Sequence, residues 1–329
     1  MLERFLLLWL VSSSGVAYVW PALLARLPGP LAVIGDPFMS SKPVLPWLIG
    51  LTMFCIGLML PRDEVTQVLR RWPTVFSGTA IQYSAMPLLA FAFGKAMGLT
   101  GPEFIGIIMV GCVPGAMASN VLTLNARDNT SYSVSLTTTA TLLSPIAVPL
   151  VLALTLRGEQ SVDTSVLQRA SVMLVLTVVL PVLAGHLLSR QFPGLEQRSR
   201  RFGATVANLA ILWIIAVVVG LNRERLAEFR VDLLAALLGI NLLGYTAGYF
   251  GGWGLRLPEP MRRALTLEVG MQNAGLGATL ATQLFPNETA TAIAPAMYTF
   301  GCMLTGTMLA RLWASRSAAA HVDEEAPAA

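Results

Sequence analysis

The stretch TLEVGMQNAGLGATLA, Thr266 to Ala281, decides how the rest of the sequence is interpreted. It consists mainly of small and apolar residues, yet it also contains Glu268, Gln272 and Asn273. A carboxylate near the centre of a lipid bilayer costs ~2.5 to 3.5 kcal/mol even on the lenient insertion scale. If this segment crosses a membrane, its polar side chains therefore predict a binding site.

The composition is that of an integral membrane protein. Of the 329 residues, 55% are hydrophobic and 12% are charged, and the mean hydropathy is +0.66. A soluble domain carries about 25% charged residues. Apolar runs close to the ~20 residues that span a bilayer recur along the chain and leave no room for a soluble catalytic domain. We expect ten membrane spans, at residues 5–24, 44–60, 73–98, 103–125, 131–156, 168–189, 203–221, 231–255, 262–285 and 289–313.

The positive charges predict the orientation of the chain. With a cytoplasmic N-terminus, 14 of the 22 Lys and Arg residues fall on the cytoplasmic side, as the positive-inside rule requires, and the C-terminus is then cytoplasmic as well. The basic residues are dispersed over separate loops, so the net charge of +4 gives no reason to expect nucleic acid as a partner. Compact loops and the absence of an Arg- and Ser-rich transit peptide favour a bacterial inner membrane.

The ten spans divide into two halves at a polar loop, residues 157–169. The first half covers residues 1–156 and the second covers residues 165–315, while the acidic segment 316–329 is predicted to be a disordered tail. Because each half has an odd number of spans, the two halves enter the membrane from opposite sides. The sequence thus predicts an all-α polytopic membrane protein of two inverted five-helix repeats, an arrangement that many secondary transporters use.

Each half contains an interrupted span. In the first half, GCVPGAMASNVLTLNARDNT places Pro114 and Gly115 in the middle of span four. In the second half, EVGMQNAGLGATLATQLFPNET places three glycines beside two amide side chains in span nine. In a single span, such glycines would be explained by close helix packing. Matching interruptions in both halves instead predict discontinuous helices that cross at a binding site near the membrane midplane.

The functional interpretation of Glu268 is a bound inorganic cation, and the alternative is a protonated carboxyl group that bonds a neighbouring amide. Glu268 and Gln272 share a helix face at i,i+4, as do Ser133 and Thr137, and an opened backbone around Gly270 would expose carbonyl oxygens. Neutral oxygens with one carboxylate suit a hard cation of low charge, whereas zinc and copper prefer thiolate or imidazole. Sodium fits this set, and a proton stays open as an alternative.

Three separate motifs, EVGMQNAGL, PGAMASNVLTLNARDNTSYSVSLTTTATLLSP and IQYSAMP, carry a family resemblance. Together they resemble the bile acid:sodium symporter family, including its bacterial organic-anion transporters, over essentially all ten spans. The resemblance implies a core of spans three to five and eight to ten, in which spans four and nine are unwound and cross. It also implies a panel of spans one, two, six and seven, and two bound sodium ions.

By motif position, the resemblance implies which residues hold each ion. The first site would be formed by Ser119, Asn120, Ser133, Thr137 and Glu268. The second site would be formed by Gln82, Glu268, Val269, Met271 and Gln272. Glu268 would serve both sites, and two cations would overcompensate its single negative charge. An anionic substrate would then be attracted to the same place.

The substrate is expected beside the ions, where the N-terminal ends of the second half-helices present N–H groups. Asn273, directly after Gln272, is the best candidate for a substrate contact. The resemblance also points to Ala116 and Met117, where related bacterial proteins tend to have smaller and more polar residues, so bile acids and pantoate are not carried over as ligands. Thr299 and Cys302 on span ten are further cavity-lining candidates, with simple packing as the alternative.

The function expected from these features is sodium-coupled symport of a small or amphipathic organic anion by alternating access. No GxxxxGK[ST] motif is present, so an ion gradient would supply the energy. Proton coupling and a passive facilitator are the alternatives. An enzyme is not expected, because Glu268 has no second carboxylate, serine–histidine pair or metal cluster near it in the sequence. The lipid bilayer and the organic anion are the expected partners, and nothing implies an obligate protein partner.

Overall fold

A computed structural model describes residues 5–24, 35–157, 163–192, 194–227 and 231–325. Every named element in these residues is a helix, so the prediction of an all-α chain is confirmed. In chain order the elements are α1 (Leu6–Leu24), α2 (Pro37–Ser40), η3 (Lys42–Val44), α3 (Leu45–Met59), α4 (Glu64–Arg70), α5 (Trp72–Ala96), α6 (Gly101–Cys112), α7 (Met117–Asn125), α8 (Thr130–Thr155), α9 (Thr164–Leu174), η4 (Val175–Val179), α10 (Leu180–Gln191), α11 (Leu195–Leu221), α12 (Arg223–Ala227), α13 (Val231–Gly254), α14 (Glu259–Gly270), α15 (Ala274–Leu284), η5 (Thr289–Ala292) and α16 (Ile293–Glu325).

Eight helical segments of the described residues are long and apolar enough to cross a membrane. They are α1, η3–α3, α5, α8, the continuous run α9–η4–α10, α11, α13 and η5–α16. Together with the composition, these segments identify an integral membrane protein. The other two expected spans, 103–125 and 262–285, are each divided into two short helices, α6–α7 and α14–α15.

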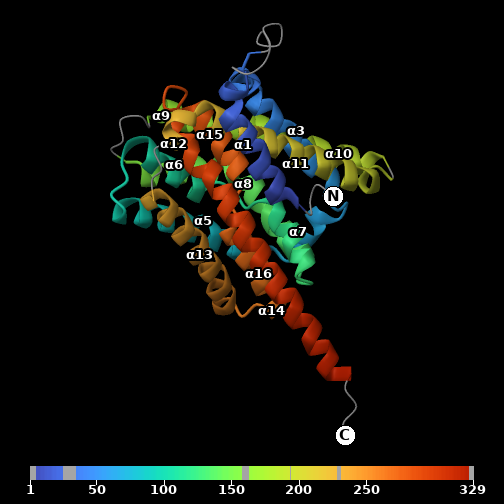
Figure 1. Cartoon of the computed structure of the whole chain (residues 1–329). Coiled ribbons are helices and arrows are strands. Elements are labelled where there is room, and N and C mark those ends of the chain that lie inside the picture. Colours follow the sequence, from blue (N-terminus) through green and yellow to red (C-terminus); the bar gives the residue numbers. More distant parts are fainter. Residues whose placement is uncertain (1–4, 25–34, 158–162, 193, 228–230, 326–329) are drawn as a thin grey trace.

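The helices pack in two neighbouring groups (Figure 1). In one group, α3 packs against α10 and α11, and α1 packs against α11. In the other group, α13 packs against α5 and α14, and α5 also packs against α6 and α8. The long helix α16 runs down the molecule towards the C-terminus and contacts α6, α7, α13 and α15. The short helices of the two divided spans therefore lie within the second group.

Glycines allow α3 and α10 to lie with their backbones in contact. A Cβ atom on Gly57 would overlap the carbonyl group of Val182, and a Cβ atom on Gly185 would overlap the carbonyl group of Phe54. Helices in lipid gain little from hydrophobic burial against one another and associate largely through van der Waals packing. The two glycines make that packing close.

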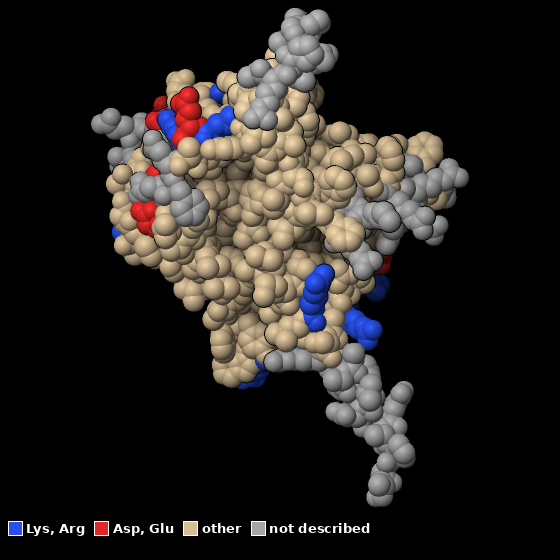
Figure 2. Space-filling model, viewed as in Figure 1, with Lys and Arg blue, Asp and Glu red and all other residues tan. Residues whose placement is uncertain are grey.

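The surface has the charge distribution of a membrane protein. On the face shown in Figure 2, the visible Lys, Arg, Asp and Glu side chains lie towards the upper and lower parts of the molecule, with a broad uncharged belt between them. Large apolar side chains are exposed on the membrane-crossing helices, for example Leu238, Leu304 and Met308. Such a surface is favourable in contact with lipid chains and unfavourable in water.

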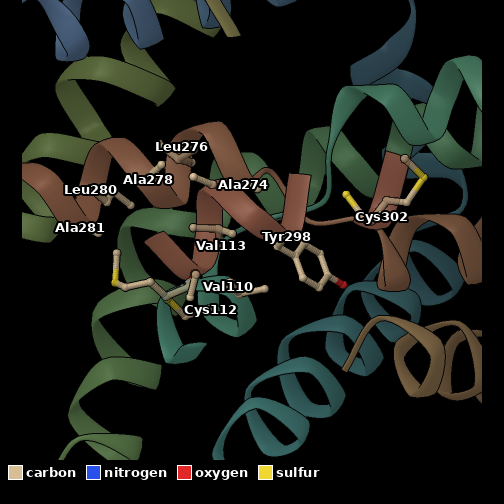
Figure 3. Close-up of a cluster of buried hydrophobic side chains, with 14 of the residues drawn as sticks. Val110, Cys112, Val113, Ala274, Leu276, Ala278, Leu280, Ala281, Tyr298 and Cys302 are labelled. Carbon is tan, nitrogen blue, oxygen red and sulfur yellow. Dashed lines mark hydrogen bonds between the residues drawn. The ribbon is translucent and has the colours of Figure 1, made fainter. Parts of the chain in front are cut away.

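The breaks in the two divided spans are enclosed by the rest of the protein: Val113, Met271 and Ala274 are at most 3% exposed. Figure 3 shows a buried apolar cluster to which α6, α15 and α16 contribute. Its members include Val110 and Cys112 of α6, Leu276 and Ala278 of α15, and Tyr298 of α16, all of which are at most 1% exposed. Non-helical backbone at membrane depth is tolerated only where protein or a cavity surrounds it. The cluster provides that surrounding for both divided spans.

At the C-terminus the structure differs from the prediction of a disordered tail over residues 316–329. Helix α16 continues to Glu325, and residues 326–329 lie outside the described residues. The segment that follows Ser315 contains three consecutive alanines, which have the highest helix propensity. Because the preceding turns of α16 are already helical, adding these residues requires no new nucleation.

A cluster of charged residues links the turn between α7 and α8 to the beginning of α14. Arg263 Nη1 lies 3.7 Å from Asp128 Oδ1, and Arg263 Nε donates to Glu259 Oε1 at 3.0 Å. The Asp128 side chain is only 3% exposed, and its Oδ2 has no hydrogen-bond partner among the described residues. Burial is the main reason that the pKa of Asp128 is raised to about 6. The positive charge of Arg263 lowers this pKa, and the negative charge of Glu259 raises it further.

We expect Asp128→Asn to stabilise the protein more at neutral pH than at mildly acidic pH. The folded-state pKa of Asp128 lies above its ordinary value of 3.8, so the buried charge destabilises the folded state increasingly as the pH rises through this range. The full effect, reached above about pH 7, is at most about 3 kcal/mol, because one pKa unit is about 1.4 kcal/mol, and about half of it develops between pH 5 and pH 8. Thermal unfolding of both proteins at about pH 8 and about pH 5 checks this. Equal Tm differences at the two pH values would contradict it.

Candidate functional site

The two divided spans cross at their breaks and pair through the backbone. α6 ends at Cys112 and α14 ends at Gly270, and the residues that follow form an isolated antiparallel bridge between Gly115 and Gln272. The Ala116 N–H donates to the Met271 carbonyl at 2.7 Å, and the Asn273 N–H donates to the Pro114 carbonyl at 2.8 Å. Each broken helix thus satisfies backbone groups that the other leaves free.

The end of α14 is held by two side chains that the sequence did not single out. Asn241 Nδ2 on α13 and Tyr298 Oη on α16 both donate to the Gly270 carbonyl at 2.8 Å. Thr305 Oγ1 in turn donates to Asn241 Oδ1 at 2.7 Å. An asparagine within an apolar membrane span is the one sequence signal that could have indicated this contact, because such a side chain needs a hydrogen-bond partner.

The carboxylate of Glu268 is fully buried at the crossing. Its Oε2 accepts hydrogen bonds from Ser119 Oγ at 2.6 Å and from Thr137 Oγ1 at 2.7 Å. Its Oε1 has no hydrogen-bond partner among the described residues. A Cβ atom on Gly115 would overlap this oxygen. Glycine at position 115 therefore allows the carboxylate to approach the unwound backbone of the other half.

The residues expected at the first ion site form one hydrogen-bonded cluster. Asn120 Oδ1 accepts from Ser133 Oγ at 2.7 Å and from Thr137 Oγ1 at 3.2 Å. Because Thr137 and Ser119 also contact Glu268, the structure brings all five residues together. They come from α7, α8 and α14 and are nearly or fully buried.

At the second expected ion site, side-chain oxygens are buried without partners. Gln82 and Gln272 are each 1% exposed. The Oε1 atoms of Gln82, Gln272 and Glu268 have no hydrogen-bond partner among the described residues. Buried polar atoms are normally satisfied, so three oxygens without protein partners in the described part of the chain suit an electropositive ligand, although the donor Gln82 Nε2 lacks such a partner as well. The carbonyl oxygen of Val269 accepts from Gln272 Nε2 at 2.6 Å and keeps a second lone pair.

Neighbouring contacts place Gln82 opposite the last turns of α14. One turn before Gln82, a Cβ atom on Gly78 would lie 3.2 Å from Leu265. One turn after it, Met86 lies close to α13 and α14, because a Cβ atom on Gly244 would lie 2.7 Å from Met86 Sδ and 3.3 Å from Gly270 Cα. Residues spaced by four share a helix face. Gln82 therefore faces the segment of α14 that carries Glu268.

The charge and the donor atoms restrict which cation could bind here. None of the salt bridges among the described residues involves Glu268. Among all the residues that the structure describes, there is no group of three or more His, Cys, Asp and Glu side chains that could hold a metal ion. The donors are one carboxylate, hydroxyls, amides and carbonyls, which match a hard cation of low charge. The residues present thus fit sodium.

Asn273 caps the second half-helix of span nine. Its Oδ1 accepts from the Leu276 N–H at 3.1 Å at the start of α15, so its amide NH₂ group is the part that could donate to a ligand. Asn273 also lines a cavity of about 10 Å³ with Met117 and Thr137, and with Met53 of α3. That volume holds about one water. Ala116, beside Met117, is half-buried and bonds the other broken span.

The two candidates on α16 are not part of the cavity at Asn273. Cys302 lines a separate and larger cavity, together with Tyr298 and Asn241. Figure 3 shows Cys302 and Tyr298 to one side of the α6–α15 cluster. Thr299 Oγ1 donates to the Pro295 carbonyl of its own helix at 3.3 Å. A substrate contact by Thr299 or Cys302 stays a prediction.

Known proteins resemble this chain over most of its length. A sequence model described as the Sodium Bile acid symporter family matches residues 46–229. The uncharacterized sodium-dependent transporter YocS of Bacillus subtilis (strain 168) is 32% identical over 292 residues, which are 87% of this chain and 88% of that protein. The probable sodium/metabolite cotransporter BASS1, chloroplastic, of Arabidopsis thaliana is 32% identical over 279 residues, 84% of this chain and 68% of that protein.

An animal protein shows the same similarity at lower identity. The ileal sodium/bile acid cotransporter of Oryctolagus cuniculus is 27% identical over 248 residues, which are 74% of this chain and 71% of that protein. These relatives bear the names of transporters rather than enzymes. The matched region of the sequence model ends before α14 and therefore does not include Glu268.

We expect Gly115→Ala to destabilise the protein, because the new methyl group would collide with the Glu268 carboxylate. Overpacking of this kind costs about 1 to 3 kcal/mol, and it would also separate Glu268 from Ser119 and Thr137. Gly275→Ala is the matched control, since the nearest atoms to a Cβ there lie at 3.8 Å. Thermal unfolding of both variants checks the expectation. A Gly115→Ala protein as stable as Gly275→Ala would show that the carboxylate does not lie against residue 115.

Proposed function

This chain belongs to the sodium bile acid symporter family, and we propose that it is a sodium-coupled symporter of a small or amphipathic organic anion. The observation that carries the proposal is the Glu268 carboxylate, which is fully buried with one free oxygen among neutral oxygen donors. A buried charge without a partner is strongly unfavourable. A bound sodium ion would supply the missing charge and ligands.

We propose two sodium ions, and their binding would prepare the site for an anion. Ser119, Asn120, Ser133, Thr137 and Glu268 would hold the first ion. Gln82, Glu268, Val269, Met271 and Gln272 would hold the second ion. Together with Glu268, two ions leave one net positive charge at the crossing. Helices α7 and α15 both begin directly after the paired breaks. Their N-terminal ends therefore lie at the crossing, where the helix dipoles favour negative charge.

For the fold, we propose ten spans in two inverted repeats, residues 1–156 and 165–315. The two divided spans occupy corresponding positions in these repeats and pair with each other. We assign the group of α1, α3, α9–α10 and α11 as the panel and the remaining spans as the core. The observed packing of the helices supports this division.

The substrate would bind where panel and core meet beside Asn273. The cavity there is lined by Met53 and Ile56 of α3 and by Met117 and Thr137 of the core. Its volume of about 10 Å³ is too small for an organic anion, since sites for such molecules measure about 300 to 1,000 Å³. Movement of the core against the panel would open the cavity, which is alternating access.

We propose a bacterial inner membrane as the location, with both termini in the cytoplasm. The bias of Lys and Arg towards that side supports this orientation. A proton-coupled transporter and a passive facilitator are the alternatives. In the first, protonation of Glu268 would replace sodium, and in the second, uptake would not follow any ion gradient. The lipid bilayer and the organic anion are the only partners that the proposal requires.

We expect Glu268→Gln to reduce sodium affinity and sodium-driven uptake sharply. The substitution keeps the size of the side chain but removes the charge shared by both proposed ions. Ser133→Ala is the comparison, because Ser133 contributes one neutral ligand to one ion. Charge-assisted contacts are roughly twice as strong as neutral ones, so Ser133→Ala should lose less. Sodium titration of substrate uptake in proteoliposomes measures both effects.

The same titration distinguishes the alternatives. The substrate for it is the organic anion that best raises the Tm in a screen with sodium, since a ligand stabilises according to its affinity and concentration. Undiminished sodium-driven uptake by Glu268→Gln would remove Glu268 from the ion sites. Uptake that followed a pH gradient in place of a sodium gradient would identify proton coupling, and uptake indifferent to both would identify a facilitator.

We expect Asn273→Asp to weaken substrate binding while sodium still stabilises the purified protein. Aspartate keeps the acceptor that caps α15 but loses the NH₂ donor and adds charge that repels an anion. Loss of a hydrogen bond to a charged group costs about 1.5 to 3 kcal/mol. Asn273→Ala should show the same loss of affinity plus about 1 kcal/mol of lost capping. Lost sodium stabilisation with unchanged substrate affinity would place Asn273 among the ion ligands.

A further inference from the structure

A cavity of about 460 Å³ lies between α11, α13 and α16, apart from the polar site. Its volume lies within the range of about 300 to 1,000 Å³ that small-molecule sites occupy. Its lining includes Val218 and Val219 of α11, Leu237 and Leu238 of α13, and Met297 and Phe300 of α16. No residue proposed to hold an ion lines this cavity, and neither does Asn273.

The polar groups in the wall of the cavity are already used. Asn241 donates to the Gly270 carbonyl and accepts from Thr305 Oγ1, at 2.8 and 2.7 Å. Tyr298 Oη donates to the same carbonyl at 2.8 Å. A buried water requires two to four polar partners, and apolar cavities stay dry. The cavity is therefore unsuited to ordered water and to the charged group of an anion. It suits a hydrocarbon.

The cavity continues onto the surface that faces lipid. Leu238 both lines the cavity and is 49% exposed on the outside of α13. On α13, Leu242 lies one turn after Leu238 and is 47% exposed. On α16, Leu304 lies one turn after the cavity residue Phe300 and is 49% exposed. The other end of the cavity lies at Asn241 and Tyr298, at the level of the helix break. A hydrocarbon chain could thus enter from the bilayer and reach the level of the crossing.

We propose that this cavity binds one acyl chain of a membrane phospholipid, which enters beside α13. Side chains around an unfilled apolar space lose van der Waals contacts, and an acyl chain restores them without leaving a polar group unpaired. The headgroup would stay at the membrane surface near Leu226, which lines the cavity in the short helix α12. This cavity contains no proposed ion ligand and does not contain Asn273, and its occupation by lipid does not depend on sodium coupling; of the substrate candidates, Cys302 alone lines it.

Gly301 offers a way to fill the cavity without disturbing its surroundings. It lines the cavity, and a Cβ atom built on it meets no atom within 4 Å. Gly301→Leu therefore places a side chain in the space of the acyl chain. Gly15→Leu on α1 is the matched control, because a Cβ there also meets nothing within 4 Å and Gly15 lies outside the cavity.

The test uses phosphatidylcholine vesicles that contain a phosphatidylcholine with a photoactivatable diazirine on one acyl chain. After irradiation, peptide mass spectrometry compares the label on Met297 and Phe300, which line the cavity, with the label on Leu304 and Met308, which face lipid. We expect Gly301→Leu to lower this ratio by about tenfold, because the new side chain displaces several methylene groups. The Gly15→Leu protein should keep the ratio of the wild type.

Three results would overturn the proposal. The first is a wild-type protein that is labelled only on Leu304 and Met308. The second is a ratio that Gly301→Leu leaves unchanged. The third is loss of the cavity label on addition of taurocholate, which would assign the cavity to the path of an organic anion. If Gly301→Leu does not fold, Gly301→Ala fills less of the space, and a partial decrease of the same ratio is then expected.

Discussion

A polypeptide backbone cannot leave its N–H and C=O groups unpaired inside a membrane, and this constraint organises the protein. A helix that ends in mid-membrane exposes several such groups. Here two helices end at the same place, and their unwound residues pair through Gly115 and Gln272. Asn241 and Tyr298 satisfy the carbonyl group at the end of α14. Each break is therefore stable only in the presence of the other and of the helices around it.

The same pairing creates the polar site. It brings Glu268 of the second half against Gly115 of the first half, and the carboxylate reaches hydroxyl groups on α7 and α8. Fully hydrogen-bonded polar networks stabilise a buried core, whereas partly satisfied ones are unfavourable. The network around Glu268 is only partly satisfied, because oxygens of Glu268, Gln82 and Gln272 lack partners. That deficit is what a cation would correct, and a bound cation would then stabilise the folded crossing.

Two cavities flank the crossing, and their chemistry is opposite. The narrow cavity at Asn273 has polar groups that can still donate or accept. The large cavity at Tyr298 has none, because its polar atoms already hold the broken helix in place. Asn241 and Tyr298, which hold the broken helix, would thus also separate a polar solute in one cavity from a hydrocarbon chain in the other. The hydrogen bonds that stabilise the fold also decide which side of the crossing is apolar.

The sequence by itself determined the membrane class, the helices and the position of both breaks, because composition, apolar length and Pro114 act locally. It also indicated Glu268, since a carboxylate in an apolar span is conspicuous wherever the chain folds. Only the tertiary structure decided that Gly115 makes room for that carboxylate, and that Asn241 and Tyr298 hold the broken helix. These residues lie far from their partners along the chain, and no spacing rule relates them. Their contacts exist because the helices pack around two breaks that must satisfy each other.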